Sequence, residues 1–126
     1  MAEAAEAMAI PINETERLIA SDKVEGTPVF NRQEERLGAV QNFMVDKYTG
    51  RVGYAVMSFG GFLGVGARYY PLPWGILGYD TRLGGYVVDL DKEALDQAPS
   101  YSADTEPAYD RAYGRHVYDY YRVPFL

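Results

Sequence analysis

The sequence has no cysteine and a single histidine, His116, in 126 residues. The missing thiols exclude disulfides, thiolate metal sites and a cysteine nucleophile. One imidazole is a poor basis for a metal centre, because such centres combine several donor side chains. We therefore expect no metal and no cofactor, and we expect His116 to lie at the surface or in an interface.

Basic charge is also scarce, with 12 Lys and Arg against 18 Asp and Glu and a net charge of −6. Nucleic-acid affinity depends on clustered Lys and Arg that neutralise phosphates. The nearest approach to a cluster is Arg111, Arg115 and Arg122, which Asp110 and Asp119 dilute. Nucleic acid is therefore not an expected partner.

No apolar run approaches the length of a membrane span. The first sixteen residues lack the basic and continuous apolar regions of a signal peptide. We expect no membrane span, a cytoplasmic location, and a disordered or loosely ordered lead-in over residues 1–16.

Glycine is abundant in one stretch, SFGGFLGVGARYYPLPW, residues 58–74. A phosphate-binding loop places a lysine and a hydroxyl after its last glycine, but Ala67 and Arg68 follow Gly66 here. Pro71 and Pro73 also exclude a helix that could direct its N-terminus at an anion. The stretch is typical of a structural or interface loop.

The candidate catalytic groups have simpler explanations. Turns and helix caps account for Asp46, Asp80 and Asp91, and Ser58 is not part of a GxSxG motif. The sequence predicts no catalytic residue, so we expect a protein that is not an enzyme.

The segment 17–99 has the pattern of a β domain. Extended segments are expected at 18–20, 27–30, 37–46, 51–59, 69–74, 76–79 and 86–88. Hairpins are expected at 47–50 and 80–85, and a short helix capped by Asp91 at 92–97. Five or six such strands with glycine at corners predict a small closed barrel. The expected buried residues are Val40, Val45, Val52, Val56, Leu72, Trp74, Val87 and Leu90.

The remaining segment, 100–126, is rich in tyrosine. Tyr109, Tyr113, Val117 and Tyr120 have helical spacing, which predicts a helix over residues 107–121 capped by Asp104 or Thr105. A helix this short is marginal alone, so we expect its stripe to pack on a barrel, its own or that of a neighbour.

The order of four blocks, at 18–31, 37–66, 69–74 and 79–95, resembles the PRC-barrel domains, and in particular their free-standing bacterial type. The resemblance implies a small, strongly bent β-barrel that acts as a protein-binding module, with no catalytic residues to transfer. We thus expect a mainly β fold: a PRC-type barrel with a short helix and a C-terminal tyrosine-rich helical tail.

The expected function is a protein-interaction module, adaptor or assembly factor, that forms a homo-oligomer, preferably a dimer, or docks on another protein. The alternatives are an accessory factor in RNA or ribosome metabolism and a small-ligand-binding barrel. The glycine loop has apolar side chains that its glycines cannot cover, and contiguous exposed apolar surface marks interfaces. The candidate interface residues are Phe59, Phe62, Leu63, Val65, Tyr69, Tyr109, Tyr113 and Tyr120.

Overall fold

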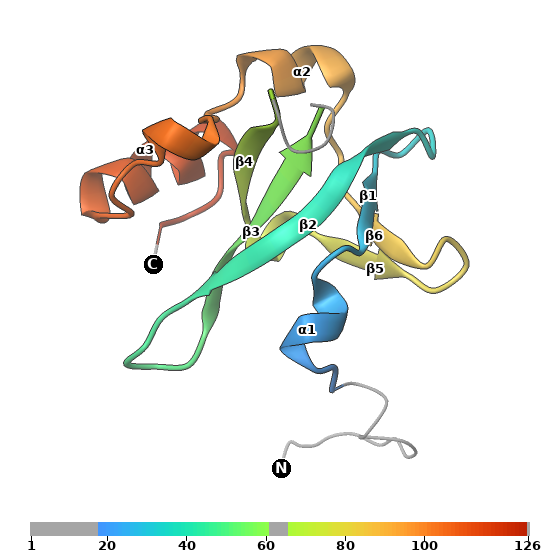
Figure 1. Ribbon diagram of the computed structural model, residues 1–126, viewed down its shortest axis with the longest axis horizontal. Helices are drawn as coiled ribbons and strands as arrows, with labels where there is room; N and C mark the ends of the chain where they lie inside the picture. The colour runs from blue at the N-terminus through green and yellow to red at the C-terminus, as the bar shows by residue number, and fades with distance from the viewer. Residues whose placement is uncertain (1–17, 61–65, 126) are drawn as a thin grey trace.

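A computed structural model describes residues 18–60 and 66–125 (Figure 1). Its six strands form one mixed sheet in the order β4-β3-β2-β1-β6-β5. The strands are β1 Pro28–Phe30, β2 Arg36–Val45, β3 Val52–Phe59, β4 Arg68–Pro73, β5 Gly78–Asp80 and β6 Gly85–Val87. Neighbouring strands are antiparallel except β1 and β6, which are parallel. The expected number of strands is confirmed.

The sheet does not close into a barrel, which corrects the sequence-based expectation. β4 and β5 are its two ends, and the described residues show no ladder between them. The outer edge of β4 carries Tyr69, Pro71 and Pro73, because alternate residues of a strand direct their N–H groups to the same side. Tyr69 already exchanges hydrogen bonds with Tyr101, and the two prolines have no N–H to donate. The edge therefore cannot accept a further strand.

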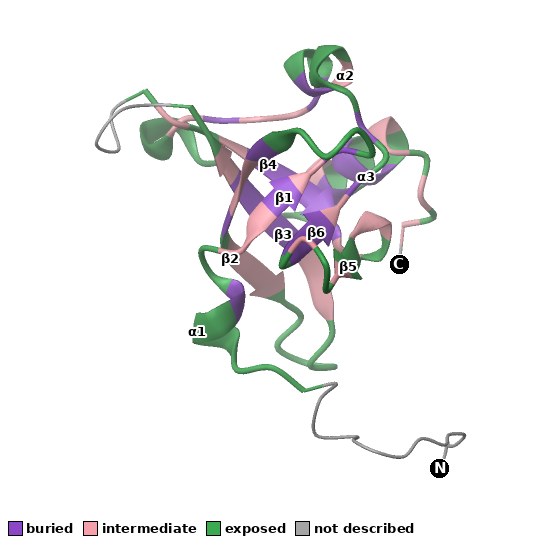
Figure 2. Cartoon of the chain, turned by 90° about the vertical axis from the view of Figure 1, so that its right-hand side faces the viewer, coloured by how far each residue is buried: buried purple, intermediate pink, exposed green. Residues whose placement is uncertain are grey.

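The inner face of the sheet holds the main core. One cluster joins side chains from five strands and from α2 (Lys92–Gln97), among them Val29, Met57, Leu72, Tyr86 and Leu95. Figure 2 shows these buried positions at the centre of the sheet. Because strands from both halves of the sheet contribute to one cluster, the sheet must curve around it. The expected strong bend is thus present although the hydrogen-bonded ring is not closed.

The expected core residues divide into three groups. Val40, Val56, Leu72 and Leu90 are buried as predicted. Val52, Trp74 and Val87 are only half-buried, and the Trp74 ring lies 6.1 Å from Phe43 and 5.7 Å from Tyr86 between ring centroids. The prediction was wrong for Val45, which is 49% exposed.

Val45 is exposed because the β2–β3 hairpin extends beyond its neighbours. The β1 partner of β2 ends opposite Ala39, and the β4 partner of β3 ends opposite Tyr54. The chain from Val45 to Val52 is therefore a two-stranded arm that points away from the sheet (Figure 1). At its tip Gly50 has a φ of +79°, and the Asp46 carboxylate accepts hydrogen bonds from the N–H groups of Tyr48 and Thr49. The predicted hairpin is confirmed.

The segment 18–20, expected as a strand, has no strand structure and lies at the surface, so this expectation was wrong. It leads into a single helical turn, α1 (Ser21–Val24), that the sequence analysis did not predict. An acidic residue in its first turn and a basic one in its last favour the helix dipole. Val24 is the buried residue of this turn.

The helix after the sheet matches its prediction. α2 covers Lys92–Gln97, and the Asp91 carboxylate accepts a hydrogen bond from the Ala94 N–H at 2.7 Å. The C-terminal helix begins later than expected: α3 covers Arg111–Tyr120, and Asp110 is its N-cap. The alternative caps, Asp104 and Thr105, belong to the 3₁₀ turn η3 (Ala103–Thr105) instead. A second 3₁₀ turn, η2 (Trp74–Ile76), replaces the expected start of the strand at 76.

Candidate protein-binding surfaces

Five of the eight candidate interface residues belong to the part of the chain that the structure describes. Phe59 ends β3, is 42% exposed and lies 6.5 Å from the ring of Tyr70. Phe62, Leu63 and Val65 lie outside the described residues. The four tyrosines, Tyr69, Tyr109, Tyr113 and Tyr120, are all half-buried. An interface role for these eight residues stays a prediction.

The tyrosines pack against their own chain. The ring of Tyr54, from β3, lies 5.3 Å from Tyr109 and 5.5 Å from Tyr118, both in edge-to-face geometry. Tyr101 is 6.3 Å from Tyr109 and 5.8 Å from Tyr69. Such aromatic pairs add about 0.5–1.5 kcal/mol each beyond the area they bury. The C-terminal segment therefore covers the outer face of β3 and β4 in the same chain.

Hydroxyl groups fix the position of this cover. The Tyr118 hydroxyl donates to the Gly53 carbonyl at 2.8 Å, and the Tyr120 hydroxyl donates to the Ala94 carbonyl of α2. The hydroxyls of Tyr101 and Tyr109 are 2.7 Å apart. The first two bonds join α3 to β3 and α2, and the third holds the segment before α3 together.

The phenol groups of Tyr113 and Tyr121 are also buried, and they have no hydrogen-bond partner within residues 18–60 and 66–125. Burial raises the pKa of Tyr54 and Tyr113 to about 12 and raises the pKa of Tyr121 further, because the apolar surroundings disfavour phenolate. The cluster therefore holds its tyrosines in the neutral form well above neutral pH.

Gly114 explains how α3 lies so close to its neighbours. A Cβ at this position would lie 2.5 Å from Cε1 of Phe125 and 2.9 Å from the Tyr54 hydroxyl oxygen. The Phe125 ring stands edge-to-face on Tyr118 at 5.3 Å, and the Arg111 guanidinium lies 5.8 Å above it. From the sequence, Gly114 only weakens the helix; in the fold it provides the space for Phe125.

A groove of about 520 Å³ runs between the arm and the C-terminal segment. The arm side and the start of β3 contribute Met44, Val45, Asp46, Thr49, Arg51, Val52, Gly53 and Tyr54, and the C-terminal side contributes Tyr109, Asp110, Arg111, Tyr118 and Phe125. Sequence reasoning missed this groove because its two walls are about sixty positions apart in the chain. In the sequence, only the aromatic residues Tyr109 and Tyr118 pointed to a surface of this kind.

The arm also carries the most exposed tyrosine, Tyr48, at 90%. Sequence reasoning placed Tyr48 in a hairpin turn and gave it no function. An aromatic residue within a polar hairpin turn lies far from the core of its domain. The position of Tyr48 in such a turn could therefore have indicated an exposed contact residue.

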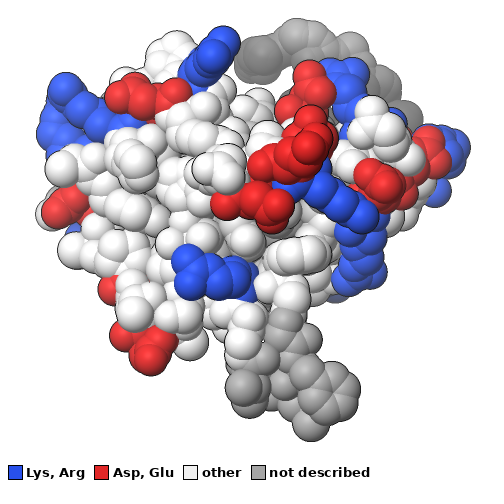
Figure 3. Space-filling view, turned by 90° about the horizontal axis from the view of Figure 1, so that it is seen from above, with Lys and Arg blue, Asp and Glu red and all other residues white. Residues whose placement is uncertain are grey.

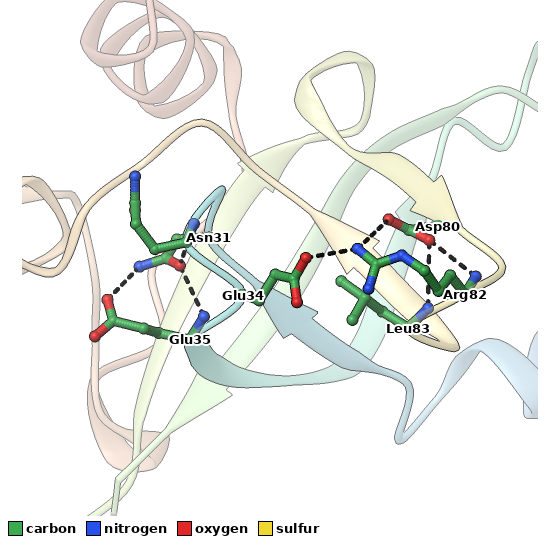
Figure 4. Close-up of polar contacts among 7 residues, drawn as sticks. Asn31, Glu34, Glu35, Asp80, Arg82 and Leu83 are labelled. Carbon is green, nitrogen blue, oxygen red and sulfur yellow. Dashed lines mark hydrogen bonds and ion pairs between the residues drawn. The ribbon is translucent and has the colours of Figure 1, made fainter.

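On one face of the molecule, charged groups of both signs lie side by side (Figure 3). Figure 3 shows Lys and Arg beside Asp and Glu on the face above α2, with uncharged surface between them. Arg82 joins Glu34 of the β1–β2 turn to Asp80 of the β5–β6 turn (Figure 4). Buried Asn31 orders the first of these turns, accepting hydrogen bonds from the N–H groups of Gln33 and Glu35 and donating to the Glu35 carboxylate. These contacts hold the two turns together. They combine positive and negative side chains and so do not form a uniformly basic or acidic binding site.

Residues 18–60 and 66–125 contain no group of three or more His, Cys, Asp or Glu side chains that could hold a metal ion. His116 is exposed, with its ring 6.5 Å from that of Tyr113. In the same part of the chain, no helix combines the length and the apolar character needed to cross a membrane.

The strand order and the packed C-terminal helix define a small six-stranded β domain with a helical cover. A family model, the PRC-barrel domain, matches residues 16–95, and the chain belongs to this family. Among solved structures, it is similar to a 16S ribosomal RNA processing protein, RimM, from Pseudomonas aeruginosa, with 23% identity and a TM-score of 0.40. That match covers 65% of this chain and 50% of the other, so the chain spans half the length of that protein. A comparison with curated proteins gives no match.

Proposed function

We propose that this chain is a non-catalytic protein-interaction module that associates with a second copy of itself or docks on another protein. One observation carries the proposal: large apolar and aromatic side chains remain exposed on a domain that has a well-formed core. They include Leu18, Ile19, Val45, Tyr48 and Phe59. Val45 and Tyr48 lie together on the β2–β3 arm. Exposed apolar side chains that lie together favour a surface that another protein covers.

The mixture of charges supports the same function. Interfaces between proteins combine apolar and aromatic contacts with a polar rim, whereas nucleic-acid sites need a basic surface. A cytoplasmic setting fits this proposal and remains an expectation.

Sedimentation velocity over a wide range of protein concentration tests the proposal. We expect the mean sedimentation coefficient to rise with concentration as dimers form. A Phe62→Asp, Leu63→Asp double variant tests the glycine loop as the surface involved, and a dimer that survives it places the interface elsewhere. A wild-type chain that stays monomeric at every concentration would contradict self-association.

A further inference from the structure

The β2–β3 arm is unusually unsupported for a segment of ordered β-structure. Isolated two-stranded hairpins are marginally stable in water and normally need a third layer. The arm has Tyr48 at its tip, 90% exposed, and Val45 on its side, 49% exposed. Tyr48 does not line the groove beside the arm and is exposed to solvent, so the tip has no packing partner within the described chain.

The groove beside the arm is suited to an aromatic side chain. Its walls present the rings of Tyr54, Tyr109 and Tyr118, and Phe125 already occupies edge-to-face geometry against one of them. The volume of about 520 Å³ falls in the range that encloses a small organic group, roughly 300–1,000 Å³. A tyrosine ring is such a group, with an apolar body and a hydroxyl that can meet water at the rim.

Both walls of the groove carry charges of both signs. The arm carries Asp46, Lys47 and Arg51, and the opposite wall carries Asp110 and Arg111. None of the three basic side chains is in an ion pair within the described residues. Because each wall has positive and negative side chains, a second arm that lies antiparallel to the first can place its charges beside opposite ones.

We propose that this chain pairs with a second copy through the arm, the Tyr48 tip of each copy seating in the groove of the other. A two-fold interface requires one patch to be complementary to itself, and the arm provides both the projecting side chain and one wall of the groove. This inference rests on the proposed function, since it names the surface through which self-association takes place.

Sedimentation equilibrium of a Tyr48→Asp variant tests the anchor. We expect the dimer dissociation constant to rise about tenfold or more, as for loss of a central aromatic contact. Tyr79→Asp is the matched control, because Tyr79 is an exposed tyrosine on β5, at the other end of the sheet. We expect it to leave the dissociation constant unchanged. Circular dichroism verifies the fold, and Tyr48→Ala provides a second variant without a new charge.

Cross-linking tests the placement directly, because the chain has no cysteine of its own. A Lys47→Cys copy mixed with an Arg111→Cys copy should form an interchain disulfide under mild oxidation, since the two positions would face each other. Lys92→Cys, on α2 and away from the arm, is the control partner and should react far more slowly (Figure 1).

The results separate the two proposals. A wild-type dimer unaffected by either Tyr48 variant, or equal cross-linking to both partners, overturns the arm interface and leaves self-association standing. A wild-type chain that is monomeric throughout overturns both.

Discussion

At the scale of single residues, the buried phenols differ in what their hydroxyl groups do. Tyr118 donates to the Gly53 carbonyl at 2.8 Å, whereas the hydroxyl of Tyr121 is buried without a partner. Removing one partner of a made hydrogen bond costs about 1 kcal/mol, while removing an unpaired buried polar group costs little or stabilises the protein.

We therefore expect Tyr118→Phe to lower the free energy of unfolding by about 1 kcal/mol. Tyr121→Phe should leave it equal or higher. Urea denaturation of both variants beside the wild type measures the difference. Equal losses in the two variants would show that the Tyr121 hydroxyl has a partner, such as a buried water.

Glycine allows two strand backbones to approach each other closely at Gly38. A Cβ on Gly38 would lie well inside contact distance of the Ser58 carbonyl oxygen and 2.9 Å from Cγ of Met57. Gly53, on the adjacent strand β3, has only the Met44 carbonyl at 3.8 Å, an ordinary contact. The close approach of the β2 and β3 backbones thus falls at Gly38, and Gly53 has room for a Cβ.

We expect Gly38→Ala to destabilise the protein by about 2 kcal/mol or more, because a backbone carbonyl cannot move aside as a side chain can. Gly53→Ala is the matched control and should change stability by less than about 1 kcal/mol. Thermal unfolding of the pair checks this. A mild effect at Gly38 would mean that β2 and β3 can separate locally without cost.

At the scale of elements, the sequence predicted what depends on local chemistry. Asp46 with Gly50 and Asp91 with Ala94 give the first hairpin and α2, because turn and cap bonds join residues that are near in sequence. The start of α3 was misplaced, since Asp104, Thr105 and Asp110 are all suitable caps and packing decides among them.

Features that depend on distant segments were not predictable in the same way. Val45 is exposed because β1 and β4 are short, and the groove arises where the arm meets the C-terminal segment. The open sheet follows from the two prolines and Tyr101 on the outer edge of β4. Each outcome depends on which elements are neighbours in the fold. The alternation of apolar and polar residues along one strand does not contain that information.

The C-terminal cover gives a prediction at this scale. Removing residues 101–126 would uncover the outer face of β3 and β4, including buried Val56 and Pro71, and would take away Val117 and Tyr118. We expect a lower unfolding midpoint and stronger binding of a hydrophobic dye. Tyr109→Ala within the full chain is a milder comparison. An unchanged midpoint after the deletion would show that the cover adds no stability to the sheet.

At the scale of the whole molecule, the net charge of −6 and the mixed surface bear on partner choice. Nucleic-acid affinity depends on clustered Lys and Arg that release counterions from phosphates, and acidic residues outnumber basic ones in this chain. We expect titration calorimetry with ATP, NAD and a short RNA to give no binding heat at physiological salt. Micromolar, salt-sensitive RNA binding would contradict this and favour a role in RNA metabolism.

The tyrosine cluster sets how the whole molecule responds to alkaline pH. Burial raises the pKa of Tyr54 and Tyr113 to about 12 and also raises that of Tyr101, Tyr109, Tyr118 and Tyr121. In the unfolded chain tyrosine ionises near pH 10. Below that pH both states hold their protons and the stability is complete; above it the unfolded state loses protons first.

The free energy of unfolding should therefore fall as pH rises from about 10 toward 12, with a slope that grows with the number of buried phenols. Urea midpoints measured across this interval test the expectation, and phenolate absorbance should appear later in the native than in the unfolded protein. Tyr113→Phe should flatten the decline, because one raised pKa is removed. A midpoint that stays constant through the interval would mean that the phenols ionise in place, so that the C-terminal cover is open to solvent.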